Sequence, residues 1–365
     1  MKFSASRETI LKPLHAVIGV VERRQTMPIL SNVLIVITDS SLKVTATDLE
    51  VELLAETEVD VESPGEITIP GRKLYDICKA LPDNAQIKIS VSGNRVTIRA
   101  GRSRFMLSTL RAADFPVVDE ISAQQTLQLD RQALRHLLEQ TQFSMAHQDV
   151  RYYLNGLLLE TEGHTLRAVA TDGHRLAMAE LQMAEAAQRD GQIIVPRKGV
   201  LELQRLLDGD GEVELTLGAN HIRAQIDSIR FTSKLIDGKF PDYERVLPAK
   251  PQNIVTVDRN LLRHALQRAA ILSNEKYRGV RLVLEDNNVT IQANNPEQEE
   301  AEESLEIEYN GESMEIGFNV NYLLDALSAV HEDQVEVGLG DMNSSCLIRG
   351  SSDNNSKFVV MPMRL

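Results

Sequence analysis

The stretch that decides the fold runs from Val150 to Leu181 and reads VRYYLNGLLLETEGHTLRAVATDGHRLAMAEL. Its apolar runs, Leu157–Leu159 and Leu166–Ala170, are separated by Gly163, which predicts two strands joined by a tight reversal. Turn-forming residues at Thr171–Gly173 then interrupt the pattern before another apolar run begins. The segment is therefore predicted to form two strands, a turn and a further strand.

Degenerate copies of this segment lie on each side of it. Asn32–Leu53 reads NVLIVITDSSLKVTATDLEVEL, and Gly279–Asn295 reads GVRLVLEDNNVTIQANN. Thr47 and Asn294 take the place of Thr171 in the two outer copies, at spacings of 124 and 123 residues. Such regular spacing over the whole chain predicts three versions of one unit.

Each copy is also predicted to carry two amphipathic helices, within the ranges 7–16, 72–81, 131–142, 197–206, 259–268 and 319–330. Asp130 and Asp258 are placed to act as N-caps, and Pro13 is expected to bend or shorten the first helix. With the further alternating strands, each copy is expected to be an α+β domain whose sheets are covered on one face by two helices. The expected domains are 1–122, 123–247 and 248–365.

The composition is that of an ordinary globular protein. The chain has 365 residues, of which 42% are hydrophobic and 25% charged, so two or three domains with their own cores are expected. No run approaches the roughly 18 apolar residues of a membrane span, and the first residues lack the apolar segment of a secretory signal. Cys78 and Cys346 match no metal-ligand spacing, so we expect no metal, no cofactor and a reducing, cytoplasmic location.

The charge is unevenly distributed. The formal net charge is −14, yet the six predicted helices contain thirteen Lys and Arg against five Asp and Glu. Basic helices on an acidic body would hold a polyanion on one side and repel it elsewhere, although Lys and Arg also simply favour helices and the last helix has no basic residue. No zinc-finger, basic-zipper or aromatic RNA-binding motif is present, so contact with phosphates, without base readout, is expected.

Several longer runs closely resemble the sliding-clamp family, the β subunits of bacterial DNA polymerase III, and above all its gammaproteobacterial members. They are QFSMAHQDVRYYLNG from Gln142, TDGHRLA from Thr171, LSNEKYRGV from Leu272, NNPEQEEAEE from Asn294 and VVMPMRL from Val359. The resemblance covers the whole chain. It implies a head-to-tail homodimer that closes a six-domain ring around duplex DNA, confers processivity on the polymerase and has no catalytic activity.

The resemblance also implies partners and a pocket that binds them, between the second and third domains. The implied partners are duplex DNA without sequence specificity, the alpha subunit of DNA polymerase III, the delta subunit of the clamp loader, translesion polymerases, mismatch repair proteins and ligase, in a cytoplasmic, nucleoid-associated location. An adaptable apolar cleft with a polar rim suits a short linear peptide. Its expected walls are Leu154, Thr171, Gly173, His174, Arg175, Leu176, Pro241, Arg245, Val246, Tyr322, Ser345, Val359, Val360, Met361, Pro362, Met363 and Arg364.

The ring joint is expected to place the edge strand around Gly101–Leu110 against the third domain. The expected interface residues are Arg102, Arg104, Phe105, Leu107, Ile271, Leu272, Glu299, Glu300 and Glu303. Arginines would face glutamates to give electrostatic register, while the apolar side chains would be buried. Taken alone, the glutamates could equally be a solvated loop.

For the DNA channel, the family points to Arg24, Arg72, Gln148, Tyr152, Tyr153 and Arg197; the two tyrosines could equally be core aromatics. Two other functions are weighed against the clamp. A hydrolase would use Asp172 and His174 as base or metal ligands, but the chain has no HExxH, GxSxG or P-loop motif. A repeat-built scaffold would bind peptides but would lack the ring and the DNA affinity.

Overall fold

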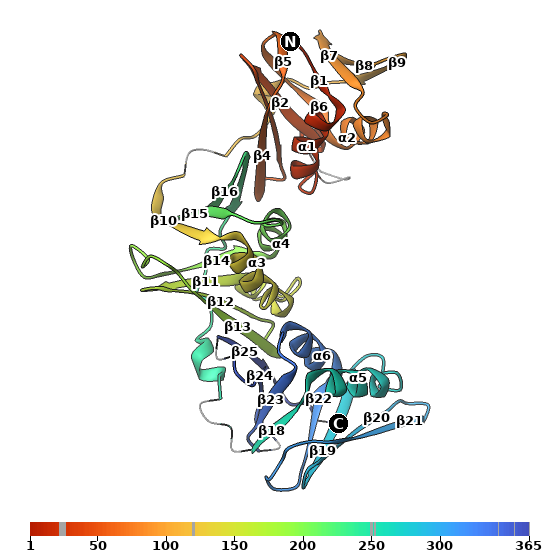
Figure 1. Ribbon diagram of the computed structural model, residues 1–365, viewed down its shortest axis with the longest axis vertical. Coiled ribbons are helices and arrows are strands. Elements are labelled where there is room, and N and C mark those ends of the chain that lie inside the picture. Colours follow the sequence, from red (N-terminus) through yellow and green to blue (C-terminus); the bar gives the residue numbers. More distant parts are fainter. Residues whose placement is uncertain are drawn as a thin grey trace. The chain divides into compact units, whose positions relative to one another are not determined.

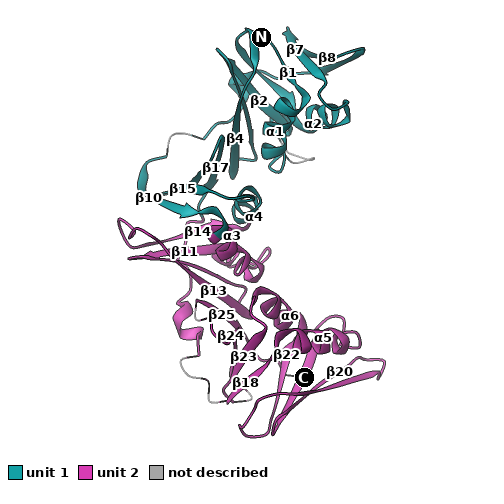
Figure 2. Ribbon diagram, in the orientation of Figure 1, with its two compact units in different colours: residues 1–132, 198–235 teal, residues 133–197, 236–365 magenta. Residues whose placement is uncertain are grey.

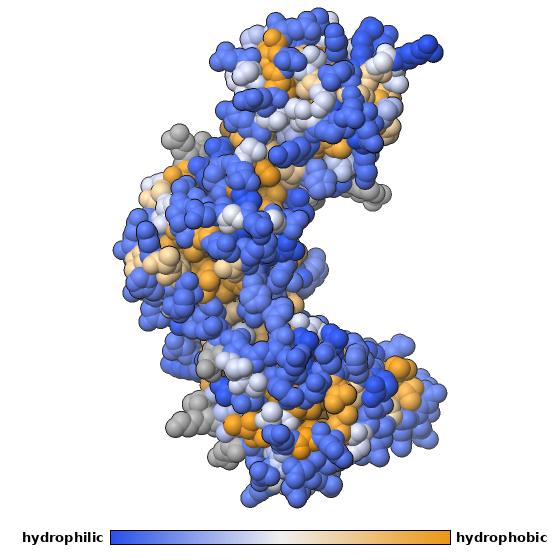
Figure 3. All heavy atoms as spheres, in the orientation of Figure 1, coloured by the Kyte–Doolittle hydropathy of each residue, from blue (hydrophilic) through white to orange (hydrophobic). Residues whose placement is uncertain are grey.

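The computed structural model describes residues 1–21, 27–118, 121–248, 251, 253–341, 343–353 and 355–364 (Figure 1). The chain folds into two compact units, one formed by residues 1–132 with 198–235 and the other by residues 133–197 with 236–365 (Figure 2). Each unit contains one eight-stranded sheet and one smaller sheet. Hydrophilic residues dominate the face of the molecule shown in Figure 3, and no helix of the described residues is long and apolar enough to cross a membrane.

All six predicted helices are present within a few residues of the expected bounds: α1 Arg7–Val17, α2 Gly71–Ala80, α3 Arg131–Glu139, α4 Arg197–Leu206, α5 Arg259–Ala270 and α6 Val320–Ala329. Asp258 caps α5 as predicted, since its carboxylate accepts a hydrogen bond of 2.8 Å from the backbone N–H of Leu261. The expectation that Pro13 shortens α1 is wrong, because the helix continues to Val17. Pro13 is itself buried in the core face of that helix, so packing offsets the hydrogen bond that proline removes.

In the first unit the smaller sheet has the strand order β5 (Asp60–Ser63), β1 (Lys2–Ser6), β7 (Gln86–Ser92), β8 (Arg95–Ala100) and β9 (Ser103–Ser108). The eight-stranded sheet has the order β10 (Ala123–Asp130), β15 (Glu212–Gly218), β16 (His221–Ile226), β17 (Ile229–Lys234), β4 (Val51–Glu58), β3 (Ser41–Thr47), β2 (Asn32–Thr38) and β6 (Gly65–Pro70). The predicted strands of the first copy are therefore present.

In the second unit the smaller sheet has the order β21 (Glu300–Glu306), β20 (Asn288–Asn294), β19 (Gly279–Glu285) and β22 (Met314–Asn319). The eight-stranded sheet has the order β14 (Gly191–Pro196), β11 (Gly156–Glu162), β12 (Thr165–Thr171), β13 (Arg175–Gln182), β25 (Ser356–Val360), β24 (Cys346–Gly350), β23 (Gln334–Leu339) and β18 (Asn253–Asp258). The segment from Val150 to Leu181 thus supplies three neighbouring strands, β11 to β13, as its sequence predicts.

Both eight-stranded sheets are shared between two copies of the repeat. In the first unit β4 of copy one pairs with β17 of copy two, for example Ala55 with Ile229. In the second unit β13 of copy two pairs with β25 of copy three, for example Leu176 with Val359. These pairings give each sheet an unbroken hydrogen-bonded ladder across a repeat boundary, a feature that the repeat pattern did not predict.

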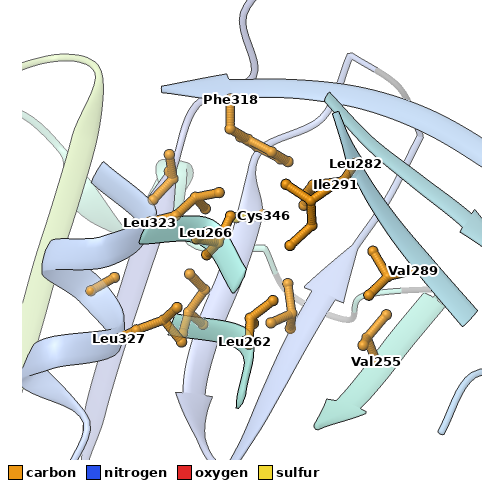
Figure 4. Close-up of a cluster of buried hydrophobic side chains, with 14 of the residues drawn as sticks. Val255, Leu262, Leu266, Leu282, Val289, Ile291, Phe318, Leu323, Leu327 and Cys346 are labelled. Carbon is orange, nitrogen blue, oxygen red and sulfur yellow. The ribbon is translucent and has the colours of Figure 1, made fainter. Parts of the chain in front are cut away.

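The third copy shows how helices and sheets bury their apolar faces together (Figure 4). Leu262 and Leu266 of α5 and Leu323 and Leu327 of α6 point into a cluster that includes side chains from β18, β19, β20 and β22. Full burial of such a side chain contributes about 1.5–3 kcal/mol each. Cys346 belongs to this core, and burial raises the pKa of its thiol to about 12, so it is a structural rather than a reactive cysteine.

Candidate peptide-binding pocket

The turn between β12 and β13 is held by its own short polar side chains. The Thr171 hydroxyl donates to the carbonyl of Arg175 (2.6 Å) and accepts from the N–H of Gly173 (3.1 Å). One carboxylate oxygen of Asp172 accepts from the N–H groups of His174 (2.9 Å) and Arg175 (3.1 Å). Gly173 has φ = +89°, a left-handed conformation that favours glycine. The turn Thr171–Arg175 is therefore a fixed structural element rather than a loose loop.

Arg175 connects this turn to neighbouring elements. Its guanidinium binds Asp172 (3.1 Å) and the carbonyl of Phe143 (2.8 Å), and it pairs with Asp325 on α6. Its central carbon lies 4.6 Å from the centre of the Tyr322 ring. The side chain is 14% exposed, so its charge is neutralised within the protein and serves mainly to position Tyr322 against the turn.

The residues that follow β25 run along the other side of the turn. Leu176 and Arg175 pair with Val359 and Val360 in the ladder between β13 and β25. Beyond the strand, the N–H of Met361 donates to the carbonyl of His174 (2.9 Å), and that of Met363 donates to the carbonyl of Gly317 (2.8 Å). These two bonds fix the tail 361–364, whose side chains at Met361 to Met363 stay partly exposed.

The base of this region is apolar. Leu176 and Val359 are almost fully buried in a cluster with Met178, Leu347 and other side chains, and Val246 packs against the same cluster. The rings of His174 and Tyr322 are stacked, with centroids 6.5 Å apart. The structure therefore brings the predicted turn, the predicted strand and Val246 together on one apolar cluster. Tyr322 joins this group through its stacking on His174 and packs against the other core cluster of the second unit.

Other predicted wall residues are less closely tied to this group. Leu154 is buried on the short helix η4 (Tyr152–Leu154). Arg245 is exposed and pairs with Asp242 at 2.7 Å. Pro241 is exposed and Ser345 is partly buried just before β24.

One residue that the sequence analysis missed fixes a wall of this site. Tyr243 begins the short helix η5 (Tyr243–Val246), and its hydroxyl donates to Glu160 (2.5 Å) and accepts from Arg167 (3.0 Å). Burial and the hydrogen bond to Glu160 raise the pKa of Tyr243. Because Tyr243 is bonded to β11 and β12, it holds η5, and with it Val246, against the sheet. In the sequence, only two features point to this role. Tyr243 follows Phe240-Pro241 closely, and its partners Glu160 and Arg167 are charged residues within the otherwise apolar strands β11 and β12.

The geometry does not support the hydrolase alternative. Both oxygens of Asp172 are engaged by the turn and by Arg175, so this carboxylate is not available as a base or a metal ligand. Within the part of the chain that the structure describes, no group of three or more His, Cys, Asp or Glu side chains could hold a metal ion.

The residues predicted for the ring joint lie on or beside the edge strands of the smaller sheets and, in the second unit, also directly after α5. Arg104, Phe105 and Leu107 are on β9, the edge strand of the first unit's smaller sheet, and Arg102 immediately precedes it. In the second unit, Glu300 and Glu303 are on the edge strand β21, while Ile271 follows α5 and is 76% exposed. Leu272 is partly buried, and Glu299 precedes β21. Glu303 already pairs with Arg268 at 2.6 Å, so it is not a free acid.

The residues predicted for DNA fall into two groups, one in each unit. In the first unit Arg72 donates twice to the carbonyl of Val21, at 3.0 and 2.6 Å; Arg24 lies outside the described residues. In the second unit Gln148 is exposed, Tyr152 is 57% exposed, and Tyr153 packs edge-on against Tyr152 and onto the apolar cluster. Arg197 donates to the carbonyl of Met145 at 3.3 Å.

Several basic residues of the helices are used within the fold. Arg7 pairs with Asp83, Arg131 with Asp227, Lys198 with Asp48, Arg205 with Glu202 and Arg268 with Glu303. The excess of positive charge that the helices offer to a polyanion is therefore smaller than their composition suggests.

A threefold α+β repeat with shared sheets, and an apolar site built from a rigid turn and a tail, defines a binding protein made of clamp domains. Three family models match the chain, for the N-terminal (1–119), central (128–242) and C-terminal (244–364) domains of the DNA polymerase III beta subunit. Over the full length of both chains, this protein is 56% identical to the beta sliding clamp of Pseudomonas aeruginosa and 51% identical to that of Escherichia coli K12.

Solved structures agree with these relatives. A crystal structure of the Pseudomonas aeruginosa sliding clamp bound to griselimycin covers both chains completely, with a TM-score of 0.97 and 56% identity. The Caulobacter crescentus beta sliding clamp matches with a TM-score of 0.97 and 41% identity, over 100% of this chain and 99% of that one. The chain therefore belongs to the DNA polymerase III beta subunit family. Its function is accordingly that of a DNA sliding clamp, a processivity subunit without catalysis of its own.

Proposed function

We propose that the protein acts as a head-to-tail homodimer whose two copies close a six-domain ring around duplex DNA. The observation that carries this proposal is the threefold repeat matched along its whole length by the clamp family. We assign the clamp domains to residues 1–122, 123–247 and 248–365. Because a closed ring is held on DNA by topology, individual phosphate contacts can stay weak enough to permit sliding.

The ring joint is assigned to the open edge strand β9 of one copy and, in the other, to the residues that follow α5 together with β21. Two features support it: both strands end their sheets, and Ile271 is 76% exposed although it is apolar. An open sheet edge is normally covered or paired. Two identical joints of this kind close a twofold-symmetric ring and leave neither edge open.

The turn Thr171–Leu176, the tail 361–364, Tyr322 and Val246 form the proposed partner pocket. Its apolar base would take leucine or phenylalanine side chains of a short linear peptide, and its partly exposed methionines can adapt to different sequences. We propose that the alpha subunit of the polymerase, the delta subunit of the clamp loader, translesion polymerases, mismatch repair proteins and ligase use this pocket in turn. The griselimycin complex of the Pseudomonas aeruginosa relative makes a cyclic peptide a suitable competitor.

On the DNA side we propose contacts from Arg72, Gln148, Tyr152, Tyr153 and Arg197, with Arg24 in addition. The exposed Gln148 and Tyr152 are the best placed of the described ones. Contacts of this type go to the phosphate backbone and carry no base specificity. Because the protein acts on DNA, we also propose a cytoplasmic, nucleoid-associated location.

Retention on DNA tests the ring directly. Protein loaded onto nicked circular DNA by a clamp loader and ATP should stay bound at high salt and leave once a restriction enzyme linearises the circle. Equal loss from circular and linear DNA would refute topological holding. Sedimentation of the protein alone separates the clamp from a peptide-binding scaffold, since a scaffold would be a monomer without affinity for duplex DNA.

A further inference from the structure

A cavity of about 720 Å³ lies in the second unit and is not formed by the residues of the partner pocket. We call it the linker cavity, because residues of the segment between copies two and three form one of its walls. Its lining combines apolar and charged side chains: Arg167, Met178, Glu180, Tyr243, Glu244, Leu247, Pro248, Pro251, Ile254, Glu336, Gly338, Leu347, Arg349 and Lys357. Its volume falls within the range of about 300–1,000 Å³ that small-molecule sites occupy.

The floor of the linker cavity is one face of the eight-stranded sheet. Met178 of β13 is paired with Lys357 of β25, and Arg349 of β24 with Glu336 of β23. Alternate residues of a strand share a face, so Met178 lies on the same face as Leu176, and Lys357 on the same face as Val359. The linker cavity and the partner pocket therefore use one sheet face, with the apolar cluster around Leu347 and Val359 in common.

Most charges around the linker cavity are paired; among the described lining residues, Lys357 and the exposed Glu244 make no ion pair. Arg167 binds Glu160 (2.6 Å) and Glu180 (2.7 Å), and Arg349 binds Glu336 (2.6 Å). Lys357 is half-buried on β25, and within the described ranges its ammonium group has no ion pair and no hydrogen bond. A half-buried ammonium group without a counter-charge is a ready site for an anion.

We propose that the linker cavity binds an organic carboxylate with an apolar body. The carboxylate pairs with Lys357, and the apolar part lies against Met178, Leu347 and Pro248. Glu180 and Glu336 do not compete for this ammonium group, because they are held by Arg167 and Arg349. The third acid of the lining, Glu244, is exposed on η5 and makes no ion pair with Lys357 within the described residues. The same chemistry is supplied by a free small acid or by an acidic side chain of a bound peptide.

The test uses the full-length protein and 4-phenylbutanoate as the probe, with the neutral 4-phenylbutanol as its matched control. Isotope-edited NMR should show shifts for backbone amides around Lys357 and Met178 with the acid, and clearly weaker binding of the alcohol. Lys357→Met removes the charge but keeps the length of the side chain, so it should weaken binding of the acid about tenfold. Lys357→Arg should retain binding, and Lys239→Met, an exposed linker residue outside the cavity, should have no effect.

Two peptide arms identify the source of the carboxylate. A partner peptide extended by a Leu-Glu segment is compared with the same peptide carrying Leu-Gln. If the Leu-Glu peptide binds more tightly than the Leu-Gln peptide, and only when Lys357 is present, the cavity is assigned to an acidic side chain of the peptide. If 4-phenylbutanoate binds but the two peptides have equal affinity, the cavity is assigned to a free acid. Equal binding of acid and alcohol, an unchanged affinity in Lys357→Met, or displacement of the probe by the unextended peptide would overturn the proposal. The unextended peptide still reports on the partner pocket, so that pocket can stand while this inference fails.

Discussion

Gly173 gives the turn of the proposed partner pocket its backbone conformation. Its φ of +89° lies in the region where side chains are strained, and a Cβ atom there would lie 3.1 Å from the guanidinium nitrogens of Arg151. Since its neighbours Thr171 and Asp172 bond the backbone of this turn, a change of backbone angle at Gly173 would also shift His174 and the carbonyl that binds Met361.

We expect Gly173→Ala to lower the free energy of unfolding by about 1–2 kcal/mol, because alanine adopts this conformation only with strain. Peptide affinity, measured by fluorescence anisotropy, should fall as well. Gly93→Ala is the matched control: Gly93 also has a positive φ, +58°, but a Cβ atom there would meet no atom within 4 Å, and the residue is in the first unit. It should lose similar stability and keep full peptide affinity. Equal peptide affinity in both variants would show that the turn does not shape the pocket.

Single residues also show what the sequence could not reveal. Counting Lys and Arg on helices predicted a basic surface, but Arg131 and Lys198 are paired with acids far away in the sequence. Arg205 likewise donates to the carbonyl of Ala16, at 2.6 Å. The residue spacing within a helix cannot show that its arginines and lysines bind residues elsewhere in the chain. The role of Tyr243 was missed for the same reason, since its partners meet it only when two strands and a linker come together.

At the scale of elements, two backbone hydrogen bonds fix the tail after β25 beside the turn of the proposed pocket. A truncation after Val360 removes both but leaves the strand β25 intact. We expect the truncated protein to unfold at nearly the same temperature. Its affinity for the partner peptide should fall at least about tenfold, because a tenfold loss corresponds to the removal of a single well-placed binding group. Glu285→Ala, which changes an exposed residue of the second unit's smaller sheet outside the proposed pocket, serves as the control. Full affinity in the truncated protein would remove the tail from the site.

The contact between α3 and the end of α6 is expected to depend on pH. The rings of His136 and His331 lie 4.6 Å apart, and burial first, then the positive charge of His331, lowers the pKa of His136, against opposing effects of Glu139 and Asp353. A lowered pKa means that the folded state favours the neutral ring. This contribution to stability is therefore present above the ordinary pKa of histidine and is lost as the pH falls through the lowered value.

The measurement is the melting temperature of the second unit's transition between pH 7.5 and pH 5. The wild-type protein should lose more stability over this range than His136→Gln, which cannot become charged. His147→Gln changes an exposed histidine and should behave like the wild type. Parallel curves for all three proteins would contradict the assignment.

The elements themselves were largely predictable, and their long-range pairing was not. Helices α1 to α6 follow from apolar spacing within each copy, and β11 to β13 follow from alternating runs broken by Gly163 and Thr171–Gly173. The pairing of β4 with β17 and of β13 with β25 joins residues more than 170 positions apart, and nothing in a local pattern specifies such a register. The linker cavity escaped prediction for the same reason.

At the scale of the whole molecule, the proposed ring depends on two joints. Ile271→Glu places a charge in the assigned joint, while in the isolated chain this side chain is exposed. We therefore expect unchanged thermal stability of the subunit, a shift from dimer to monomer in sedimentation, and loss of retention on circular DNA. Leu261→Glu is the control, because Leu261 lies at the start of α5, ten residues before Ile271, is 58% exposed and is not among the residues assigned to the joint. A dimeric Ile271→Glu protein would place the joint elsewhere.

The shared sheets also limit how such proteins can be recombined. In a chimaera that exchanges whole repeats between two relatives, β4 and β17 would come from different parents, and so would β13 and β25. Each of these pairs would then have to form the same hydrogen-bonded register with a strand of different sequence. A cut that exchanges 198–235 together with 1–132 keeps every ladder of the first unit within one parent. Shuffling between related genes should therefore succeed along these discontinuous units and fail along the repeats that the amino-acid pattern displays.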